Sequence, residues 1–386
     1  MAEKAIEKKR HKTIRYFDYS LVAVLIFLIC FGLVMLYSSS AYTALTTFGD
    51  SMYYFKRQLI FSLASIAVML FVSRIDYHIY AKFATVLYGV AMFLMLLVRY
   101  SPLGKEVNGA RRWLIIPGTD QSFQPSEIMK IAIILLIPVL ICKMGKKIRS
   151  IKGIVHILVW GGIAFFGIYY LTDNLSTALI VMGMVCVLIF VAHPKTAPFA
   201  AAATAGIGVL VIAVRVLVKV MENSGSFRLN RILTWLNPEK YAASGGYQVM
   251  QGLYAIGSGG FFGKGLGNSA QKSVIPEVQN DMILSVICEE LGVFGAIIVL
   301  ILFGMLLYRL LFIAQNAPDM YGSLIVTGIF THIALQVFLN VAVVINLIPT
   351  TGITLPFISY GGTSVVFLMI EMGIALGVAR RIKFED

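Results

Sequence analysis

The sequence predicts an all-α polytopic membrane protein with about ten transmembrane helices. Hydrophobic residues make up 59% of the 386-residue chain, charged residues make up 13%, and the mean hydropathy is +0.85. A soluble domain carries about 25% charged residues. A membrane helix needs roughly 20 mostly apolar residues, and such segments lie at 17–37, 58–72, 79–98, 127–141, 154–171, 176–192, 197–218, 282–308, 324–345 and 357–378.

The placement of Lys and Arg predicts the topology. Ten crossings put both termini on one side, and the stretches 1–16, 74–82, 143–152 and 380–383 are rich in basic residues. Because short basic stretches stay in the cytoplasm, both termini are expected there. The predicted organisation is a basic tail 1–16, one transmembrane domain 17–379 and a tail 380–386. The net charge of +13 is then explained by topology and anionic headgroups, so no nucleic acid partner is expected.

The first apolar run, the cysteines and the histidines are interpreted as structural. The basic start and the first apolar run imitate a secretory signal, but the run is longer than a signal core, so an uncleaved first span is preferred. The four cysteines lie in apolar runs and the five histidines are scattered. No metal-ligand cluster is therefore predicted.

Two outward loops are long enough to carry function, 99–126 and 219–280. In the larger loop, between the seventh and eighth spans, apolar residues recur at helical spacing between Leu229 and Leu236 beside Trp235, which predicts a helix in the membrane interface. Six glycines then crowd 257–267. This segment either offers backbone amides to a phosphate or is a bare turn that packs against the membrane.

An aspartate, Asp281, stands where the larger loop meets the eighth span, and Glu289 and Glu290 follow inside the same apolar stretch. Carboxylates at membrane depth are costly, so they indicate a functional site. The alternative is that Asp281 merely caps the eighth helix. Glu127 and Lys130, three residues apart on the fourth span, share one helical face, and Gln336, Asn340 and Glu371 are further polar residues inside spans.

Prolines and glycines interrupt the apolar pattern between Pro349 and Gly362. Irregular backbone at membrane depth occurs only where protein or a cavity surrounds it. The segment is therefore expected to form a wall of a substrate cleft, with a tight external turn as the alternative.

Five groups of residues resemble a known family. They are Asn108-Gly109-Ala110-Arg111-Arg112-Trp113; Gln124-Pro125-Ser126-Glu127 with Lys130; Gly246-Tyr247-Gln248 with the glycine segment to Gly267; Pro276-Glu277 to Asp281 with Glu289-Glu290-Leu291-Gly292; and Pro349-Thr350-Thr351-Gly352 to Gly361-Gly362. In this order they resemble the SEDS family (shape, elongation, division and sporulation) over nearly the whole chain. The sequence around Arg111-Arg112-Trp113 and in the carboxyl-terminal segment is more similar to FtsW than to RodA members. One departure is Gln279-Asn280, where members often have His-Thr.

The resemblance implies a peptidoglycan glycosyltransferase that polymerises lipid II at the outer face of the bacterial cytoplasmic membrane. It implies a single-pass class B penicillin-binding protein as partner, alongside other division proteins and membrane lipids, and it makes Asp281 the catalytic residue. No cofactor is certain, although a divalent cation (Mg²⁺ or Mn²⁺) is possible. The predicted substrate-binding residues are Arg112, Arg111, Lys130, Glu127, Glu289 and Lys264.

The expected chemistry needs a base and cations. A carboxylate takes the proton from an attacking sugar hydroxyl, and guanidinium or ammonium groups neutralise the departing diphosphate. Each assignment has a structural alternative: Arg111 and Arg112 contact lipid headgroups, and Lys130 pairs with Glu127. Two rival functions also stay open, a lipid II flippase or transporter, since intramembrane charges mark transport pathways, and a non-catalytic scaffold for a cell-wall synthase.

Overall fold

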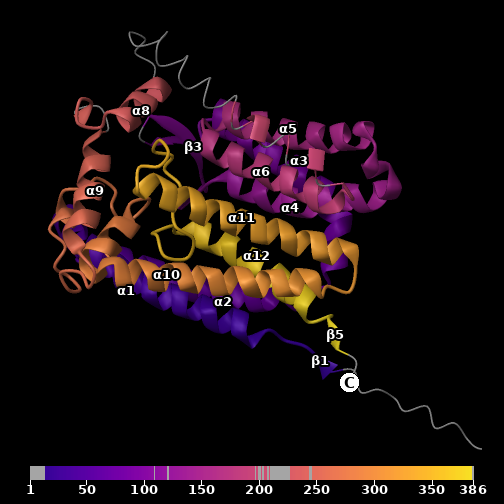
Figure 1. Ribbon diagram of the computed structural model, residues 1–386, viewed down its shortest axis with the longest axis horizontal. Coiled ribbons are helices and arrows are strands. Elements are labelled where there is room, and N and C mark those ends of the chain that lie inside the picture. Colours follow the sequence, from indigo (N-terminus) through magenta and orange to yellow (C-terminus); the bar gives the residue numbers. More distant parts are fainter. Residues whose placement is uncertain are drawn as a thin grey trace, which may run out of the picture.

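The computed structural model describes residues 14–107, 109–119, 121–195, 197–198, 201, 204–206, 208, 227–242 and 246–384. Long helices run side by side along the molecule (Figure 1). Eight of the described helices are long and apolar enough to cross a membrane: α1 (Tyr19–Phe48), α2 (Tyr53–Val72), α3 (Tyr77–Tyr100), α4 (Pro125–Met144), α5 (Ile151–Leu171), α6 (Leu175–Ala192), α10 (Ile283–Gln315) and α11 (Met320–Val344).

A further apolar helix, α12 (Thr363–Ala379), is shorter, with 17 residues. The predicted all-α polytopic fold is therefore confirmed, and nine of the expected spans correspond to described helices. The expected span 197–218 lies mostly outside the described residues. The tenth span begins six residues later than predicted, at Thr363 instead of 357, because Phe357 (φ +62°) and Gly362 (φ +46°) have left-handed backbone that a helix cannot contain.

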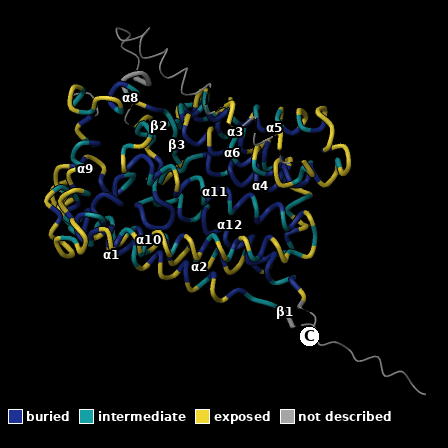
Figure 2. The backbone as a smooth tube through the Cα atoms, viewed as in Figure 1, coloured by how far each residue is buried: buried dark blue, intermediate teal, exposed yellow. Residues whose placement is uncertain are grey.

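The helices form a bundle around a buried centre. Figure 2 shows dark blue, buried residues concentrated along α4, α11 and α12, with exposed residues on the outer helices. In α4 and α11 most residues of the apolar stretch are buried inside the protein, whereas less than a third of the stretch is buried in α2, α3 and α5. The outer helices thus present apolar side chains where a lipid bilayer would lie.

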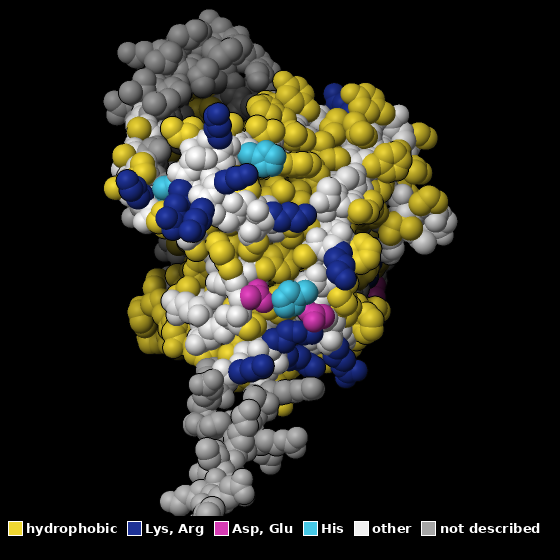
Figure 3. Space-filling view, turned by 90° about the vertical axis from the view of Figure 1, so that its right-hand side faces the viewer, with side chains coloured by type: hydrophobic (Ala, Val, Ile, Leu, Met, Phe, Trp, Pro, Cys, Tyr) yellow, Lys and Arg dark blue, Asp and Glu magenta, His cyan; other side chains and the backbone are white. Residues whose placement is uncertain are grey.

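One end of the bundle, which we call the terminal end, holds both ends of the described chain. Strand β1 (Ile14–Arg15) pairs antiparallel with β5 (Lys383–Phe384). The 3-10 helix η1 (Gly145–Arg149), with three basic residues, follows α4 at this end. Figure 3 looks at this end and shows Lys and Arg side chains gathered on it. The described basic stretches that predicted the topology, 74–82, 143–152 and 380–383, therefore share this end.

The opposite end, which we call the hairpin end, carries the irregular elements. A three-stranded antiparallel sheet, β2 (Gly104–Val107), β3 (Ala110–Ile115) and β4 (Ser122–Phe123), fills the loop between α3 and α4. It is not among the sequence predictions. Helix α8 (Phe227–Leu236) confirms the helix expected near 229–236, and α9 (Gly246–Gly259) and the 3-10 helix η3 (Gln271–Ser273) complete this end.

Helix α10 is kinked where the glycine segment crosses it. Gly292, inside α10, has φ +70°, and a Cβ there would lie 2.2 Å from the carbonyl oxygen of Phe261. Backbone amides of Val293 and Phe294 donate to the carbonyls of Gly260 (3.0 Å) and Phe261 (3.1 Å). Only glycine permits backbones to approach this closely. The glycine segment thus packs on α10, and its two interpretations stay predictions.

Candidate active site

Asp281 lies in a turn at the hairpin end, two residues before the first residue of α10. The N-cap residue of α10 is Met282, and no side chain caps this helix, so the capping alternative for Asp281 is wrong. The half-buried Asp281 carboxylate accepts a hydrogen bond from Nε2 of Gln248 on α9 at 3.2 Å. Gln248 Nε2 also donates to the carbonyl of Pro276 at 3.3 Å, so it holds the side chain and the turn together.

The backbone of Asp281 is fixed from below by α11. The Asn340 side chain is fully buried, and its Nδ2 donates to the carbonyl oxygens of Asp281 and Ile353, each at 2.8 Å. A buried amide is stable only when it is hydrogen-bonded, so these two bonds determine where the Asp281 turn sits. Asn340, predicted only as a polar residue without a partner, thereby becomes a positioning residue of the site.

The surroundings of Asp281 change its acidity. Burial raises the pKa of Asp281 to about 6, and the negative charge of Glu277 acts in the same direction. Arg231 and the hydrogen bond from Gln248 act in the opposite direction. A carboxylate with this pKa is ionised at neutral pH but is a stronger base than an ordinary aspartate. Asp281 is therefore suited to accept a proton.

The segment that connects α11 to α12, residues 345–362, lies beside the Asp281 turn. Its second half is largely buried in the protein, whereas Ile345 and Leu347 are exposed. Leu355, Phe357 and Ile358 are buried. A Cβ on Gly32 of α1 would lie 2.7 Å from Ile358 Cα, so α1 packs directly on this backbone. The alternative of an external turn is therefore wrong, and the surrounding helices supply the protein shell that irregular backbone needs at this depth.

Side chains from several helices hold the connecting segment by its backbone. Gln336 Nε2 donates to the Thr354 carbonyl at 3.0 Å, and Ser176 Oγ on α6 donates to the Thr351 carbonyl at 2.9 Å. The backbone amide of Tyr360 donates to the Gln279 carbonyl at 2.9 Å, which joins the segment to the Asp281 turn. The segment and the turn thus form one rigid unit at the hairpin end.

Helix α8 brings a cation to the site. Arg231 is an electrostatic neighbour of Asp281, and its Nη1 donates to the Thr350 carbonyl at 3.2 Å. Trp235 Nε1 on the same helix donates to the Asn346 carbonyl at 3.0 Å. The two contacts fasten α8 to the connecting segment. Arg231 is thus the cation whose charge acts on Asp281.

The two predicted arginines of the sheet are engaged elsewhere. All three guanidinium nitrogens of Arg111 donate to backbone carbonyls, those of Gly104 (3.2 Å), Arg99 (3.2 Å) and Ser101 (2.7 Å). Arg112 Nη2 donates to the Asp173 carbonyl, between α5 and α6, at 3.1 Å. These contacts dock the sheet on α3, α5 and α6, whereas Asp281 contacts α9 and α11. The substrate-binding role of both arginines stays a prediction.

Glu127 and Lys130 form a buried ion pair in the first turns of α4. The Lys130 Nζ and Glu127 Oε1 atoms are 2.9 Å apart, and both side chains are largely shielded from solvent. This geometry is the structural pairing given above as the alternative for Lys130. Their predicted contact with substrate is not tested by it.

Glu289, Lys264 and Glu290 belong to a separate cluster at the kink of α10. Glu289 is fully buried and accepts from Lys264 Nζ (2.7 Å), from the Ser269 hydroxyl and from the backbone amides of Ala270 and Gln271 (3.2 Å each). Glu290 accepts from Ser38 Oγ on α1 at 2.6 and 2.7 Å. The two glutamates thus anchor the loop before η3.

The described carboxylates do not form a ligand set for a divalent cation. Within the described ranges no group of three His, Cys, Asp or Glu residues is placed to hold a metal ion. The oxygens of Glu289 and Glu290 are already occupied by cations, hydroxyls and amides. We therefore derive no chemical step through a divalent cation.

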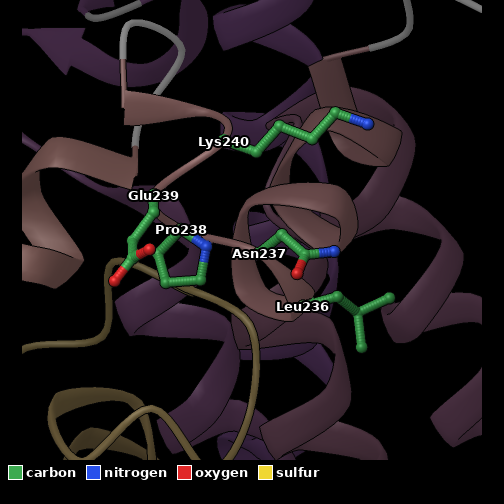
Figure 4. A pocket seen from close by; sticks show the side chains of 5 residues that line it. All are labelled: Leu236, Asn237, Pro238, Glu239 and Lys240. Atoms are coloured by element: carbon green, nitrogen blue, oxygen red, sulfur yellow. The ribbon is translucent and has the colours of Figure 1, made fainter.

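A hollow of about 310 Å³ lies directly after α8, lined by Leu236, Asn237, Pro238, Glu239 and Lys240 (Figure 4). These residues are consecutive, and the charged side chains of Glu239 and Lys240 point in different directions. A site for chemistry brings together polar groups from several elements. This hollow is the surface of one turn, and the Asp281 turn, which joins α9, α11 and the connecting segment, is the better candidate.

Fold and site together define a polytopic membrane protein with a half-buried carboxylate of raised pKa at one end of its helix bundle. The sequence profile of the family described as "Cell cycle protein", which bears the names FtsW, RodA and SpoVE, matches residues 19–383. Stage V sporulation protein E of Bacillus subtilis is 39% identical over 367 residues, covering 94% of this chain and 97% of that protein. A probable peptidoglycan glycosyltransferase FtsW of Trichlorobacter lovleyi is 37% identical over 376 residues, covering 96% of each.

Solved structures agree with this match. One chain from "Structural coordination of polymerization and crosslinking by a peptidoglycan synthase complex" superposes with a TM-score of 0.77 at 25% identity, covering 96% of this chain and 99% of that one. Thermus thermophilus rod shape determining protein RodA shares the fold with a TM-score of 0.68 at 24% identity, covering 96% and 98%. The chain belongs to the FtsW, RodA and SpoVE family, as the motifs indicated.

Proposed function

We propose that this chain is a peptidoglycan glycosyltransferase that polymerises lipid II at the outer face of the bacterial cytoplasmic membrane. The observation that carries the proposal is the half-buried Asp281, whose pKa of about 6 suits proton abstraction at neutral pH. The relatives named as probable peptidoglycan glycosyltransferases support the reaction class. The likeness to a chain of a peptidoglycan synthase complex supports a class B penicillin-binding protein as partner.

In the proposed reaction, Asp281 takes the proton of a sugar hydroxyl while that oxygen attacks the anomeric carbon of the second substrate. The bond from this carbon to the lipid diphosphate breaks, and the diphosphate leaves with the electron pair. Arg231, the cation that acts on Asp281, stabilises the growing negative charge. Arg112, Arg111 and Lys130 keep the supporting role that the resemblance predicts for them.

The activity is tested by incubating the purified chain, alone and with its partner transpeptidase, with lipid II and measuring glycan chains. The complex is expected to form glycan, and the complex with Asp281→Ala is expected to form none. Glycan from the Asp281→Ala complex would exclude this base. No glycan from the unaltered complex would favour transport of lipid II or a scaffolding role instead.

The orientation is a separate proposal: the terminal end faces the cytoplasm, because its basic face follows the positive-inside rule. Single cysteines at Glu106 in β2 and at Lys147 in η1, in a cysteine-free background, report the two ends. A membrane-impermeant thiol reagent is expected to label only the first in intact cells. Labelling of only the second cysteine would show that the topology is inverted, and would exclude lipid II polymerisation at the outer face.

A further inference from the structure

A second cation stands at the outer turn of α2, the end that faces the sheet. Arg57 donates from Nη1 to the Tyr53 hydroxyl at 2.6 Å and from Nη2 to Gln121 Oε1 of the sheet loop at 3.1 Å. Both acceptors are neutral, and in the described part of the chain no carboxylate lies within 4.0 Å of the Arg57 guanidinium. The neighbouring Lys56, by contrast, pairs with Asp50 at 2.8 Å. The guanidinium also lies 5.4 Å from the centroid of the Tyr53 ring, so its protein contacts in the described residues are with neutral groups.

Arg57 is connected to the Asp281 turn through two tyrosines. It is an electrostatic neighbour of both Tyr54 and Tyr360. The rings of Tyr54 and Tyr360 meet edge to face with their centroids 4.9 Å apart. The Tyr360 amide in turn donates to Gln279, two residues before Asp281. Arg57, the two rings and the Asp281 turn therefore follow one another at the hairpin end.

The neighbouring side chain, Gln58, keeps this arrangement in place. Gln58 is buried, and its Oε1 accepts from the amides of Gly361 and Gly362 at 3.4 Å each. The first turns of α2 are thereby joined to the residues that immediately follow Tyr360. A guanidinium held by such a frame loses little freedom when it binds a ligand.

The chemistry of Arg57, Tyr54 and Tyr360 suits the binding of a lipid-linked sugar diphosphate. Guanidinium binds phosphate oxygens through two parallel hydrogen bonds. Arg57 lies in the first turns of a membrane-spanning helix, which is the depth of lipid headgroups, and tyrosines are favoured at the same depth. A lipid diphosphate whose chain lies in the bilayer would bring its charge to this level.

We propose that Arg57, with Tyr54 and Tyr360, binds the diphosphate-sugar headgroup of the substrate whose hydroxyl Asp281 deprotonates. The proposal rests on the proposed function, because glycan polymerisation needs two lipid-linked substrates. The leaving diphosphate is bonded to the reacting carbon and must lie beside Asp281, where Arg231 acts. The diphosphate of the attacking substrate lies the length of its disaccharide away. Helices α8 and α2, which carry the two arginines, lie on opposite sides of the bundle (Figure 1).

Steady-state kinetics of the full chain with its partner transpeptidase test this subsite. Arg57→Gln is expected to raise the KM for lipid II about tenfold or more, with kcat within about threefold, because a charge-assisted binding contact is removed. Arg57→Lys keeps the charge without the fork, so its KM is expected to lie in between. Lys56→Gln, a neighbouring cation paired with Asp50, is the matched control and is expected to leave both constants unchanged.

Direct binding separates this proposal from the polymerase itself. Lipid II binding is measured to the full chain carrying Asp281→Asn, with and without Arg57→Gln, and about tenfold weaker binding is expected for the double variant. This result would support the subsite even if the unaltered complex formed no glycan. Equal lipid II affinity in the two proteins, or a KM for Arg57→Gln equal to that of the unaltered protein, would overturn the subsite. If Arg57→Gln does not fold, the KM of Arg57→Lys decides in the same way.

Discussion

Helix α10 has acidic residues at two levels, and the two levels differ in what surrounds them. Asp281, just before the helix, is half-buried, and one neutral side chain, Gln248, donates to its carboxylate. Glu289 and Glu290, further along, are fully buried, and hydroxyls, amides and the cations of Lys264 and Lys272 surround them. A saturated carboxylate stabilises structure, whereas a carboxylate with weak neutral partners is available for chemistry. The depth at which a carboxylate is buried therefore does not by itself distinguish a candidate catalytic base from a structural carboxylate.

The largest effect that separates the two levels is on catalysis. Asp281→Asn keeps the size of the side chain but cannot accept the proton, so kcat is expected to fall about 10²- to 10⁴-fold. The melting temperature of the purified chain should stay unchanged, since Asp281 caps no helix. Glycan synthesis from lipid II measures the first quantity and thermal unfolding in detergent the second. A variant that lost stability and activity together would place Asp281 with the structural glutamates.

At the second level the expected loss is in stability. Glu289→Gln leaves the Lys264 ammonium without its carboxylate and weakens the bonds to the loop, which should cost about 2–4 kcal/mol of unfolding free energy. The kcat per folded molecule is expected to stay near that of the unaltered protein. Asp50→Asn, which breaks the exposed pair with Lys56, is the control and should leave the melting temperature unchanged. A raised KM for lipid II at unchanged stability would instead assign Glu289 to substrate binding.

Asn340 tests whether the position of the Asp281 turn matters as well as its charge. Asn340→Leu removes the two hydrogen bonds that hold the carbonyls of Asp281 and Ile353. The turn should then shift, and kcat is expected to fall about tenfold, because small displacements of a catalytic group are costly. The KM for lipid II is expected to change less. Asn340→Asp is expected to lower kcat as well, since a carboxylate cannot donate to either carbonyl. A full kcat in both variants would remove the positioning role.

The fold was largely predictable from the sequence because long apolar runs and basic turns are local signals. The predicted start of α12 was too early, and the cause is not local in sequence. Phe357 and Gly362 have left-handed backbone in a segment on which other helices pack. The sheet 104–123 was missed because short exposed strands in a polar loop carry little periodic signal.

The site was predictable in its central residue but not in its surroundings. Asp281 stood out as a carboxylate at a membrane boundary. Gln248 and Arg231 reach Asp281 from α9 and α8, and no sequence spacing shows such contacts between distant elements. The sequence also did not show that Arg111 and Lys130 make contacts inside the protein, and their substrate-binding role stays a prediction.

The smallest predicted effect uses two neighbours of Asp281 whose influences on its pKa are opposite. The acid limb of kcat/KM is expected near pH 6, since protonated Asp281 cannot act as a base. Gln248→Leu removes a hydrogen bond that lowers the pKa of Asp281, so the limb should move to higher pH. Glu277→Gln removes a negative charge that raises this pKa, so the limb should move to lower pH. Glu239→Gln, on the turn after α8, is the control and should leave the acid limb unchanged. Shifts of both variants in the same direction would show that a group other than Asp281 titrates. Asp281 would then no longer be distinguished, as the proposed base, from the structural glutamates Glu289 and Glu290.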